Sequence, residues 1–494
     1  MRFAHTTKFV LFCARLSYHI FMWYNPYMKF TKTQVNTLLA LGGVTVILFV
    51  GMFFLPWVNP AFAENPPGPE IPTETPPPHN PFRGPRPAAD PFLEWEINLG
   101  GSGDETVVAA FGLTEEIIIF GNTTSNDYDF ESTGAGAFAV LISFDGRPIA
   151  YFTFEGVLER VVPLDNGFLL CINTETESFL IETDALGIEI RRIDLQRGPN
   201  ERIIDVYIDY FAEIRTPPGQ PLELFHAVME YTNPFDGYKE LRVHVLTDEF
   251  EDRFQRFFRR AQSLEYVAAY AHAGGFYLFA NLRGFNESVL TFYNWTRGTF
   301  TETSFDNLIL PLIPFYTVDA VIPAGLGRYI SLIRTENNIP FLIDSYQDFR
   351  RNVIRPLSNV PVRNVRLMAG ANMFYVYEYQ IGDRSVLWRF DHDDLRIADA
   401  GELREFTNLI ALDTHIITRF GTLFCGRTVD SVQIIGTNER GVNFTRSFLS
   451  RNETINTMIE TPRGLILIGE STGVGINVGG NFGGSDIWVS KLLF

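Results

Sequence analysis

A unit of four short strands, repeated along most of the chain, constrains this sequence more than any other feature. The first copy reads DETVVAAFGLTEE, EIIIFGNTTS, AFAVLISFDG and RPIAYFTFEG between residues 104 and 156. Apolar and polar residues alternate within each segment, and turns rich in Gly, Asn and Asp separate the segments. Further copies begin near residues 157, 204, 264, 317, 363, 409 and 453. Their mean spacing of about 50 residues is typical of the repeats from which β-propellers are built.

The connection between the third and fourth strands of the unit carries a turn signature. It reads Asp145-Gly146 in the first copy and begins at Asp184 and ends at Gly187 in the second. Because Asp and Gly tolerate positive φ, we expect tight turns at both places. The fifth copy is the least regular, since its first segment, LPLIPFYTVDAVIPAG, contains several prolines.

The eight units predict an all-β fold, a β-propeller with eight four-stranded blades, with seven blades as the alternative. The last unit has only three strands and ends in GGSDIWVSKLLF, residues 483–494. The segment EWEINLGG, residues 94–101, precedes the first unit and matches a fourth strand. We therefore predict that residues 95–99 pair with residues 487–493, so that the N-terminal strand closes the last blade. Such closure protects sheet edges that an open row of blades would expose.

The sequence divides into an N-terminal cytoplasmic segment (1–36), a transmembrane helix or signal-anchor (37–58), a Pro-rich spacer (59–92) and the propeller domain (93–494). Residues 37–58 carry no charge and are long enough to span a bilayer core of about 30 Å as a helix. Lys29 and Lys32 lie just before this helix, and the next basic residue is Arg83. The positive-inside rule therefore predicts a single-pass protein of the cell membrane with an extracytoplasmic C-terminal body.

A cleaved signal peptide is the alternative interpretation of the same region. Translation from Met28 rather than Met1 would give a basic start, and Ala61-Phe62-Ala63 is an A-x-A cleavage site. Cleavage near Ala63 would release a secreted protein. The apolar run is longer than a usual signal core of about 7–15 residues, which favours a retained anchor. The proline density of residues 59–92 favours an extended spacer that rises about 3.1 Å per residue.

Charge and cysteine content exclude several classes of function. Of the 40 basic residues, five lie before residue 64, whereas all 58 acidic residues lie after residue 63, so the remainder has a net charge of −23. Such an acidic body argues against nucleic acid as a partner, because nucleic-acid binding needs a basic surface. The three cysteines, Cys13, Cys171 and Cys425, are too few and too far apart for a disulfide framework or a metal cluster. We expect Cys171 and Cys425 to be buried thiols.

Three motifs resemble the repeats of bacterial secreted and envelope β-propeller proteins. They are a W-x-x-x-x-G-G-S stretch from Trp95 to Ser102, in which Asp104 comes one residue earlier than in the repeat, GNTTSNDYDF at residues 121–130, and GGSDIWVSKL at residues 483–492. The match covers the first and last units, whereas the middle units fit by pattern alone. The resemblance implies an eight- or seven-bladed propeller in the bacterial envelope, and it implies no single function, because proteins of this fold have many functions.

The sequence contains no H-E-x-x-H or GxxxxGK[ST] motif, and its one G-x-S-x-G match, at residues 469–473, opens no helix and is therefore not a nucleophile elbow. Catalytic residues are not indicated. The best ligand-binding candidates are Asn126, Asp127 and Asp129, between the second and third strands of the first unit. Oxygen ligands at alternate positions are able to hold Ca²⁺, which is the one cofactor the sequence suggests. A solvated turn is the competing interpretation, because the loop lacks the other ligands of a calcium loop.

Three hypotheses for function follow. The first is a membrane-tethered scaffold that binds a protein or an envelope polymer, with the membrane contacted through the N-terminal helix. The second is a glycan-acting hydrolase or lyase, which requires two or more convergent, buried carboxylates at one mouth of the propeller channel. The third is a structural assembly element, which would be indicated by a large apolar patch on an outer blade edge.

Overall fold

The computed structural model describes most of the region from residue 93 to residue 493, and every described residue lies in the unit Pro76–Phe494. The described ranges are 93–130, 135–195, 200–209, 225–247, 249–250, 252–258, 263–272, 275–282, 287–294, 299–304, 316–324, 328–346, 353–370, 373–391, 397–407, 409–418, 421–438, 441–449, 453–472 and 484–493.

The described strands form eight four-stranded antiparallel sheets, which we call blades 1 to 8. Blade 1 contains β2 (Glu105–Gly112), β3 (Glu116–Thr123), β4 (Gly136–Ser143) and β5 (Pro148–Phe154). Blade 2 contains β6 (Val157–Leu164), β7 (Gly167–Asn173), β8 (Ser178–Asp184) and β9 (Glu189–Leu195). Blade 3 contains β10 (Glu201–Ile208), β11 (Phe225–Thr232), β12 (Lys239–Leu246) and β13 (Asp252–Phe258). Blade 4 contains β14 (Leu264–His272), β15 (Gly275–Leu282), β16 (Glu287–Asn294) and β17 (Thr299–Ser304).

The other four blades have the same order of strands. Blade 5 contains β18 (Tyr316–Pro323), β19 (Arg328–Thr335), β20 (Pro340–Tyr346) and β21 (Val353–Pro356). Blade 6 contains β22 (Val362–Ala369), β23 (Met373–Gln380), β24 (Arg384–Asp391) and β25 (Ile397–Thr407). Blade 7 contains β26 (Ala411–Thr418), β27 (Gly421–Arg427), β28 (Ser431–Asn438) and β29 (Gly441–Leu449). Blade 8 contains β30 (Glu453–Thr461), β31 (Gly464–Ser471), β32 (Asp486–Leu493) and β1 (Leu93–Leu99).

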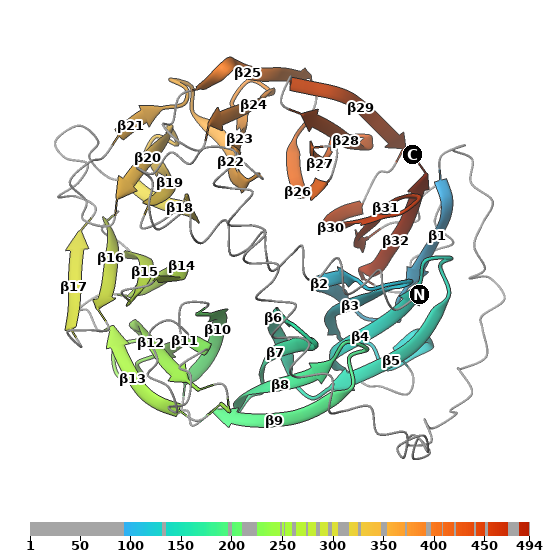
Figure 1. Ribbon diagram of the computed structural model, residues 1–494, viewed down its shortest axis with the longest axis vertical. Helices are drawn as coiled ribbons and strands as arrows, with labels where there is room; N and C mark the ends of the chain where they lie inside the picture. Colours follow the sequence, from blue (N-terminus) through green and yellow to red (C-terminus); the bar gives the residue numbers. More distant parts are fainter. Residues whose placement is uncertain are drawn as a thin grey trace, which may run out of the picture. The chain divides into compact units, whose positions relative to one another are not determined.

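The blades are arranged as an all-β propeller (Figure 1). The first strand of each blade lies toward the centre and the last toward the periphery. Each blade contacts the next in chain order, and blade 8 contacts blade 1 through β30 and β2. Eight apolar clusters fill the junctions, one between each pair of neighbouring blades. The core is therefore a ring of interfaces between blades rather than one central mass.

The predicted closure of the last blade is confirmed. β1 pairs antiparallel with β32, and the register places Leu99 opposite Ile487 and Trp95 opposite Lys491. Trp95 is buried and donates its indole N–H to the carbonyl of Phe144 in blade 1, at 2.9 Å. The N-terminal strand thus completes blade 8 and also contacts blade 1.

Every first strand contains a β-bulge near its start. The register shifts in β2, β6, β10, β14, β18, β22, β26 and β30 all occur within the first five residues of the strand. A bulge adds one unpaired residue and increases the local twist of the strand. The eight bulges form a structural repeat that is not visible as a fixed residue type in the sequence.

The turn and cysteine predictions are also confirmed. Gly146 and Gly187 have φ values of 85° and 89°, and each donates its backbone N–H three residues back, at 2.9 and 3.1 Å. Cys171 and Cys425 are buried free thiols.

The predicted transmembrane helix (37–58), the spacer (59–92), the cleavage site at Ala63 and Cys13 lie outside the described residues. Among the helices that the structure does describe, none has the length and apolar character needed to cross a bilayer.

Candidate functional site

The predicted ligand residues lie in the connection from β3 to β4, next to the turn that joins β1 to β2. Asn126 is exposed to solvent, whereas Asp127 and Asp129 are half-buried. Asp127 accepts the backbone N–H of Ser102 through Oδ1 at 2.7 Å, and Asp129 accepts that of Gly100 through Oδ2 at 3.0 Å. Both aspartates therefore fix the backbone of the turn at which the ring closes.

Five consecutive backbone amides in this turn donate to side-chain oxygens. The acceptors for the amides of residues 100 to 104 are, in order, Asp129, Glu105, Asp127, Ser125 and Thr124. We call this arrangement of residues 100–105 and 123–129 the closure clasp. A run of adjacent amides attracts anions, and here the protein's own oxygens occupy that role.

Glu105 is the centre of the closure clasp and is 0% exposed. Its Oε1 accepts hydroxyl hydrogen bonds from Thr123 at 2.7 Å and Ser125 at 2.5 Å, and its Oε2 accepts the Gly101 amide at 3.1 Å. A buried carboxylate is tolerated only when donors surround it in this way.

Two glycines allow the turn to approach its acceptors. A Cβ atom on Gly100 would lie 2.1 Å from Oδ1 of Asp486, and one on Gly101 would lie 2.4 Å from Cβ of Ser125. Because real Cβ atoms do not approach so closely, the clasp in this form requires glycine at positions 100 and 101.

The closure clasp is also bonded to the C-terminal end of the chain. Ser485 donates its hydroxyl to the carbonyl of Glu105 at 2.7 Å and its amide to Oδ1 of Asp104 at 3.0 Å. Asn98 donates its side-chain amide to Oδ2 of the buried Asp486 at 2.8 Å. The clasp therefore joins blade 1 to both terminal strands of blade 8.

Glu105 and Asp486 are two buried carboxylates that converge on Gly100, whereas the enzyme hypothesis requires such a pair at a mouth of the channel. Each accepts hydrogen bonds from the chain's own donors, as described above. General acid–base catalysis needs a carboxyl within reach of substrate, and both of these side chains are 0% exposed. Among the described residues, no group of three or more His, Cys, Asp or Glu side chains is placed to hold a metal ion.

A second polar cluster lies on the first strands of blades 2, 3 and 4. Asp205 on β10 accepts the Tyr266 hydroxyl through Oδ2 at 2.6 Å, and its Oδ1 lies 3.4 Å from Nε of Arg160. Burial, with Asp205 adding to it, raises the pKa of Tyr266 well above its usual range. The side chain of Arg160 is 58% exposed, so the cluster meets solvent on the blade 2 side. Sequence reasoning missed it, since its members are about 50 residues apart.

Asparagine side chains clamp several junctions between blades. Asn122, Asn173 and Asn281 are each the seventh residue of a second strand. Each binds both the N–H and the C=O of one residue in the next blade, with distances of 2.7 to 3.0 Å. That residue is the one immediately before the bulge, namely Leu158, Ile203 or Val318.

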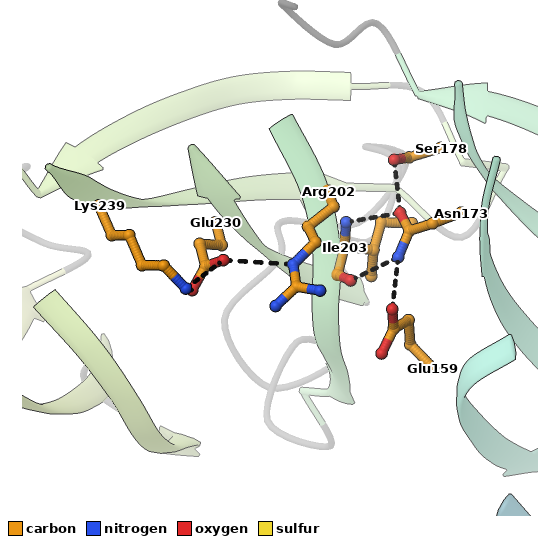
Figure 2. Close-up of polar contacts among 7 residues, drawn as sticks. All are labelled: Glu159, Asn173, Ser178, Arg202, Ile203, Glu230 and Lys239. Carbon is orange, nitrogen blue, oxygen red and sulfur yellow. Dashed lines mark hydrogen bonds and ion pairs between the residues drawn. The ribbon is translucent and has the colours of Figure 1, made fainter. Parts of the chain in front are cut away.

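Figure 2 shows the clamp between blades 2 and 3. Asn173 bonds the backbone of Ile203, and it also contacts Glu159 at 3.2 Å and Ser178 at 2.6 Å. Next to Ile203, Arg202 donates to Glu230 at 3.2 Å, and Lys239 donates to the same carboxylate at 3.0 Å. Of these contacts, only the bonds between Asn173 and Ile203 cross the junction, whereas the contacts of Glu230 with Arg202 and Lys239 lie within blade 3.

The connections from second to third strands define one face of the propeller, which we call the turn face. Three of them present exposed apolar side chains, namely Phe235 in blade 3, Ile381 in blade 6 and Val429 in blade 7. Phe235 is 96% exposed. Its turn is braced, because Asn233 Oδ1 accepts the Phe235 amide at 3.0 Å and Asp236 Oδ1 accepts the Tyr238 amide at 2.9 Å.

No family model and no curated protein matches the sequence. Among solved structures, the chain is similar to BamB from Moraxella catarrhalis, with 12% identity, a TM-score of 0.43, and coverage of 79% of this chain and 100% of that one. It is also similar to the WD40 domain of SCAP from fission yeast, with 8% identity, a TM-score of 0.46, and coverage of 79% and 96%. A puromycin hydrolase S511A mutant complexed with PGG matches at 13% identity and a TM-score of 0.43, with coverage of 74% of this chain and 58% of that one. Similarities this weak carry no argument about function, and the propeller assignment rests on strand pairing.

Proposed function

We propose that this protein is a binding scaffold, held outside the cytoplasm by residues 37–58 and raised from the membrane by residues 59–92. Its partner is a protein or an envelope polymer that docks on the turn face. The observation that carries the proposal is Phe235, an aromatic side chain left almost fully exposed at the tip of a braced turn.

Phe235 has the properties of an interaction anchor. Aromatic side chains dominate interface energetics because they bury a large apolar area when they enter a pocket. The hydrogen bonds of Asn233 and Asp236 hold the turn in place, so docking orders little additional backbone. The corresponding turns of blades 2 and 5 carry the exposed polar residues Glu177 and Glu336 instead. The apolar tips are thus a property of particular blades.

The sequence supports the proposed location. The uncharged segment 37–58 fits a bilayer span, and the charge preceding it fits an N-terminus in the cytoplasm. The acidic body would not adhere to an anionic membrane surface, which fits a domain held away from the membrane by the spacer. A reporter fused at the C-terminus that is active only outside the cytoplasm tests the topology, and an inactive, well-expressed fusion would refute it.

A glycan-acting hydrolase or lyase is the second candidate. Glu105 and Asp486 favour it by their convergence on Gly100, and the hydrogen bonds that they accept from Gly101 and Asn98 count against it. Calcium at Asn126, Asp127 and Asp129 is a separate proposal, supported by the half-exposed carboxylates of that loop.

Site-specific photocrosslinking tests the binding function. A benzophenone amino acid replaces Phe235 in the full chain, which is then irradiated in intact cells. We expect one discrete adduct, and we expect none from the same probe at Ile417, which is exposed at the end of β26 on the opposite face. The absence of a Phe235 adduct, together with turnover of an envelope glycan by the purified chain, would establish the enzyme instead.

A further inference from the structure

Two aromatic side chains are exposed on a single turn of the turn face. Phe235 is 96% exposed and Tyr238 is 42% exposed, and both belong to the connection from β11 to β12. The amide of Asn233 donates to the carbonyl of Tyr238 at 2.8 Å, which closes the turn and keeps both residues on it. Asp236 lies between them in the chain and is also exposed. The turn therefore presents aromatic surface with a carboxylate beside it.

The connections from second to third strands carry charge of one sign. Those of blades 2, 3, 5, 6 and 7 are described in full, and none of the five contains Lys or Arg. Their acidic residues are all exposed, namely Glu175, Glu177, Asp236, Glu336, Asp383 and Asp430. Asp383 pairs with Arg363 of β22 at 3.0 Å. The described connections of the opposite face include the exposed Arg147 and Arg463, so the uniform sign is a property of the turn face.

Exposed carboxylates flank the aromatic turn on both sides. In blade 2, Asn173 bonds the backbone of blade 3, and the exposed Glu175 follows two residues later. Toward blade 4, the amide of Lys239 donates to the hydroxyl of Ser263 at 3.1 Å, and the exposed Glu265 lies two residues beyond. The aromatic turn thus lies within an acidic surrounding.

Two basic side chains lie in the same area, and one carboxylate contacts both of them. Lys239 and Arg202 donate to Glu230 at 3.0 and 3.2 Å (Figure 2). The exposed carboxylates of the flanking connections outnumber the charge that this contact leaves over. The surface around Phe235 therefore keeps a net negative charge.

We propose that the partner bound at this turn is a cationic protein, with an apolar pocket for Phe235 and with Lys and Arg side chains around that pocket. The inference rests on the proposed scaffold function and narrows its partner from a protein or an envelope polymer to a basic protein. Protein interfaces combine a desolvated apolar centre with a polar rim, and this turn with its flanking carboxylates has that arrangement. Complementary charge steers association, so an acidic face favours a basic partner and repels an anionic polymer.

Charge reversal in the photocrosslinking experiment tests the inference. The probe is the benzophenone amino acid at position 235 of the full chain in intact cells. Glu175→Lys combined with Glu177→Lys should reduce the yield of the adduct at least fivefold. The matched control, Glu115→Lys combined with Asp165→Lys, changes the net charge equally at exposed positions of the opposite face and should leave the yield unchanged.

A second variant guards against a folding defect in the first. Asp236→Asn removes one charge and keeps a side-chain oxygen that is able to accept the Tyr238 amide. It should lower the adduct yield at least twofold while the circular dichroism spectrum stays unchanged. Mass spectrometry of the adduct should identify a basic protein, crosslinked at a segment that has Lys or Arg residues next to apolar ones.

The possible outcomes separate this inference from the scaffold function. An adduct whose yield is insensitive to the turn-face variants, or falls equally in the control, would overturn the cationic partner and leave the scaffold standing. An adduct with a glycan, an acidic protein or a second copy of this chain would do the same. If the probe gives no adduct in the otherwise unchanged chain, the scaffold function fails and this inference fails with it.

Discussion

The clamp at Asn173 allows the stability of one blade junction to be calculated and tested. Asn173 is 7% exposed, and its amide bonds both backbone groups of Ile203, at 2.9 and 3.0 Å. Ile203 is itself completely buried. In Asn173→Ala both of these backbone groups lose their side-chain partner.

The expected cost follows from those two groups. A buried N–H or C=O without a partner costs about 1–3 kcal/mol, so two groups at the lower part of that range cost about 3 kcal/mol in free energy of unfolding. The control is Ser178→Ala, which removes one hydroxyl bond to the same Asn173 side chain and leaves the clamp in place. It should cost about 1 kcal/mol, the net value of one hydrogen bond.

Urea unfolding followed by circular dichroism measures both variants, and hydrogen exchange locates the effect. Asn173→Ala should lower the protection of amides in β7 and β10 about 100-fold, because each 1.4 kcal/mol is a factor of ten. Amides in blade 6, on the far part of the ring, should keep their protection from exchange. The reasoning would be refuted if Asn173→Ala were no more destabilising than Ser178→Ala, or if protection fell equally in all blades.

Three further predictions follow from the described contacts. Glu105→Gln places an N–H₂ group where the closure clasp needs an acceptor, so it should destabilise the protein by about 2 kcal/mol; an unchanged unfolding midpoint would contradict the role of Glu105. Burial raises the pKa of the Glu378 carboxyl above its usual 4.5, so the folded state prefers the protonated form. The stability that this group contributes is present below pH 4.5 and is lost as pH rises. Glu378→Gln should therefore stabilise the protein at pH 7 and have no effect at pH 4. A loss of stability at pH 7 would show that the pKa of Glu378 is not raised in the folded state. Calorimetric titration with calcium chloride should give one site that Asp127→Asn weakens at least tenfold, and no heat above dilution would exclude calcium at Asn126, Asp127 and Asp129.

The sequence alone was sufficient to predict the structural features that recur along the chain. Alternation and turn residues locate the strands, and the incomplete last unit locates the closing strand, because each of these signals is local. Even the fifth unit, with its prolines, forms four strands, since β18 begins at Tyr316 after most of them. Its Pro323 is the last residue of the strand, where proline is tolerated.

The contacts between units were not predictable in the same way. Asn122 and Asn173 are ordinary polar residues in the sequence, and their clamping role appears only when the next blade places a bulge beside them. Asp127 and Asp129 were identified as ligand candidates because they alternate, yet the structure assigns one oxygen of each to a backbone amide. Their partners lie about 25 residues away across the closing turn, and a single sequence contains no signal for that contact.

An experimental structure of the full chain, by crystallography or electron microscopy, tests the central claim most directly. That claim is a ring of eight four-stranded blades in which the two ends of the domain share one sheet. The density should show eight sheets, with Leu99 of β1 directly opposite Ile487 of β32. A ring of seven sheets, or β1 paired with any strand other than β32, would contradict it.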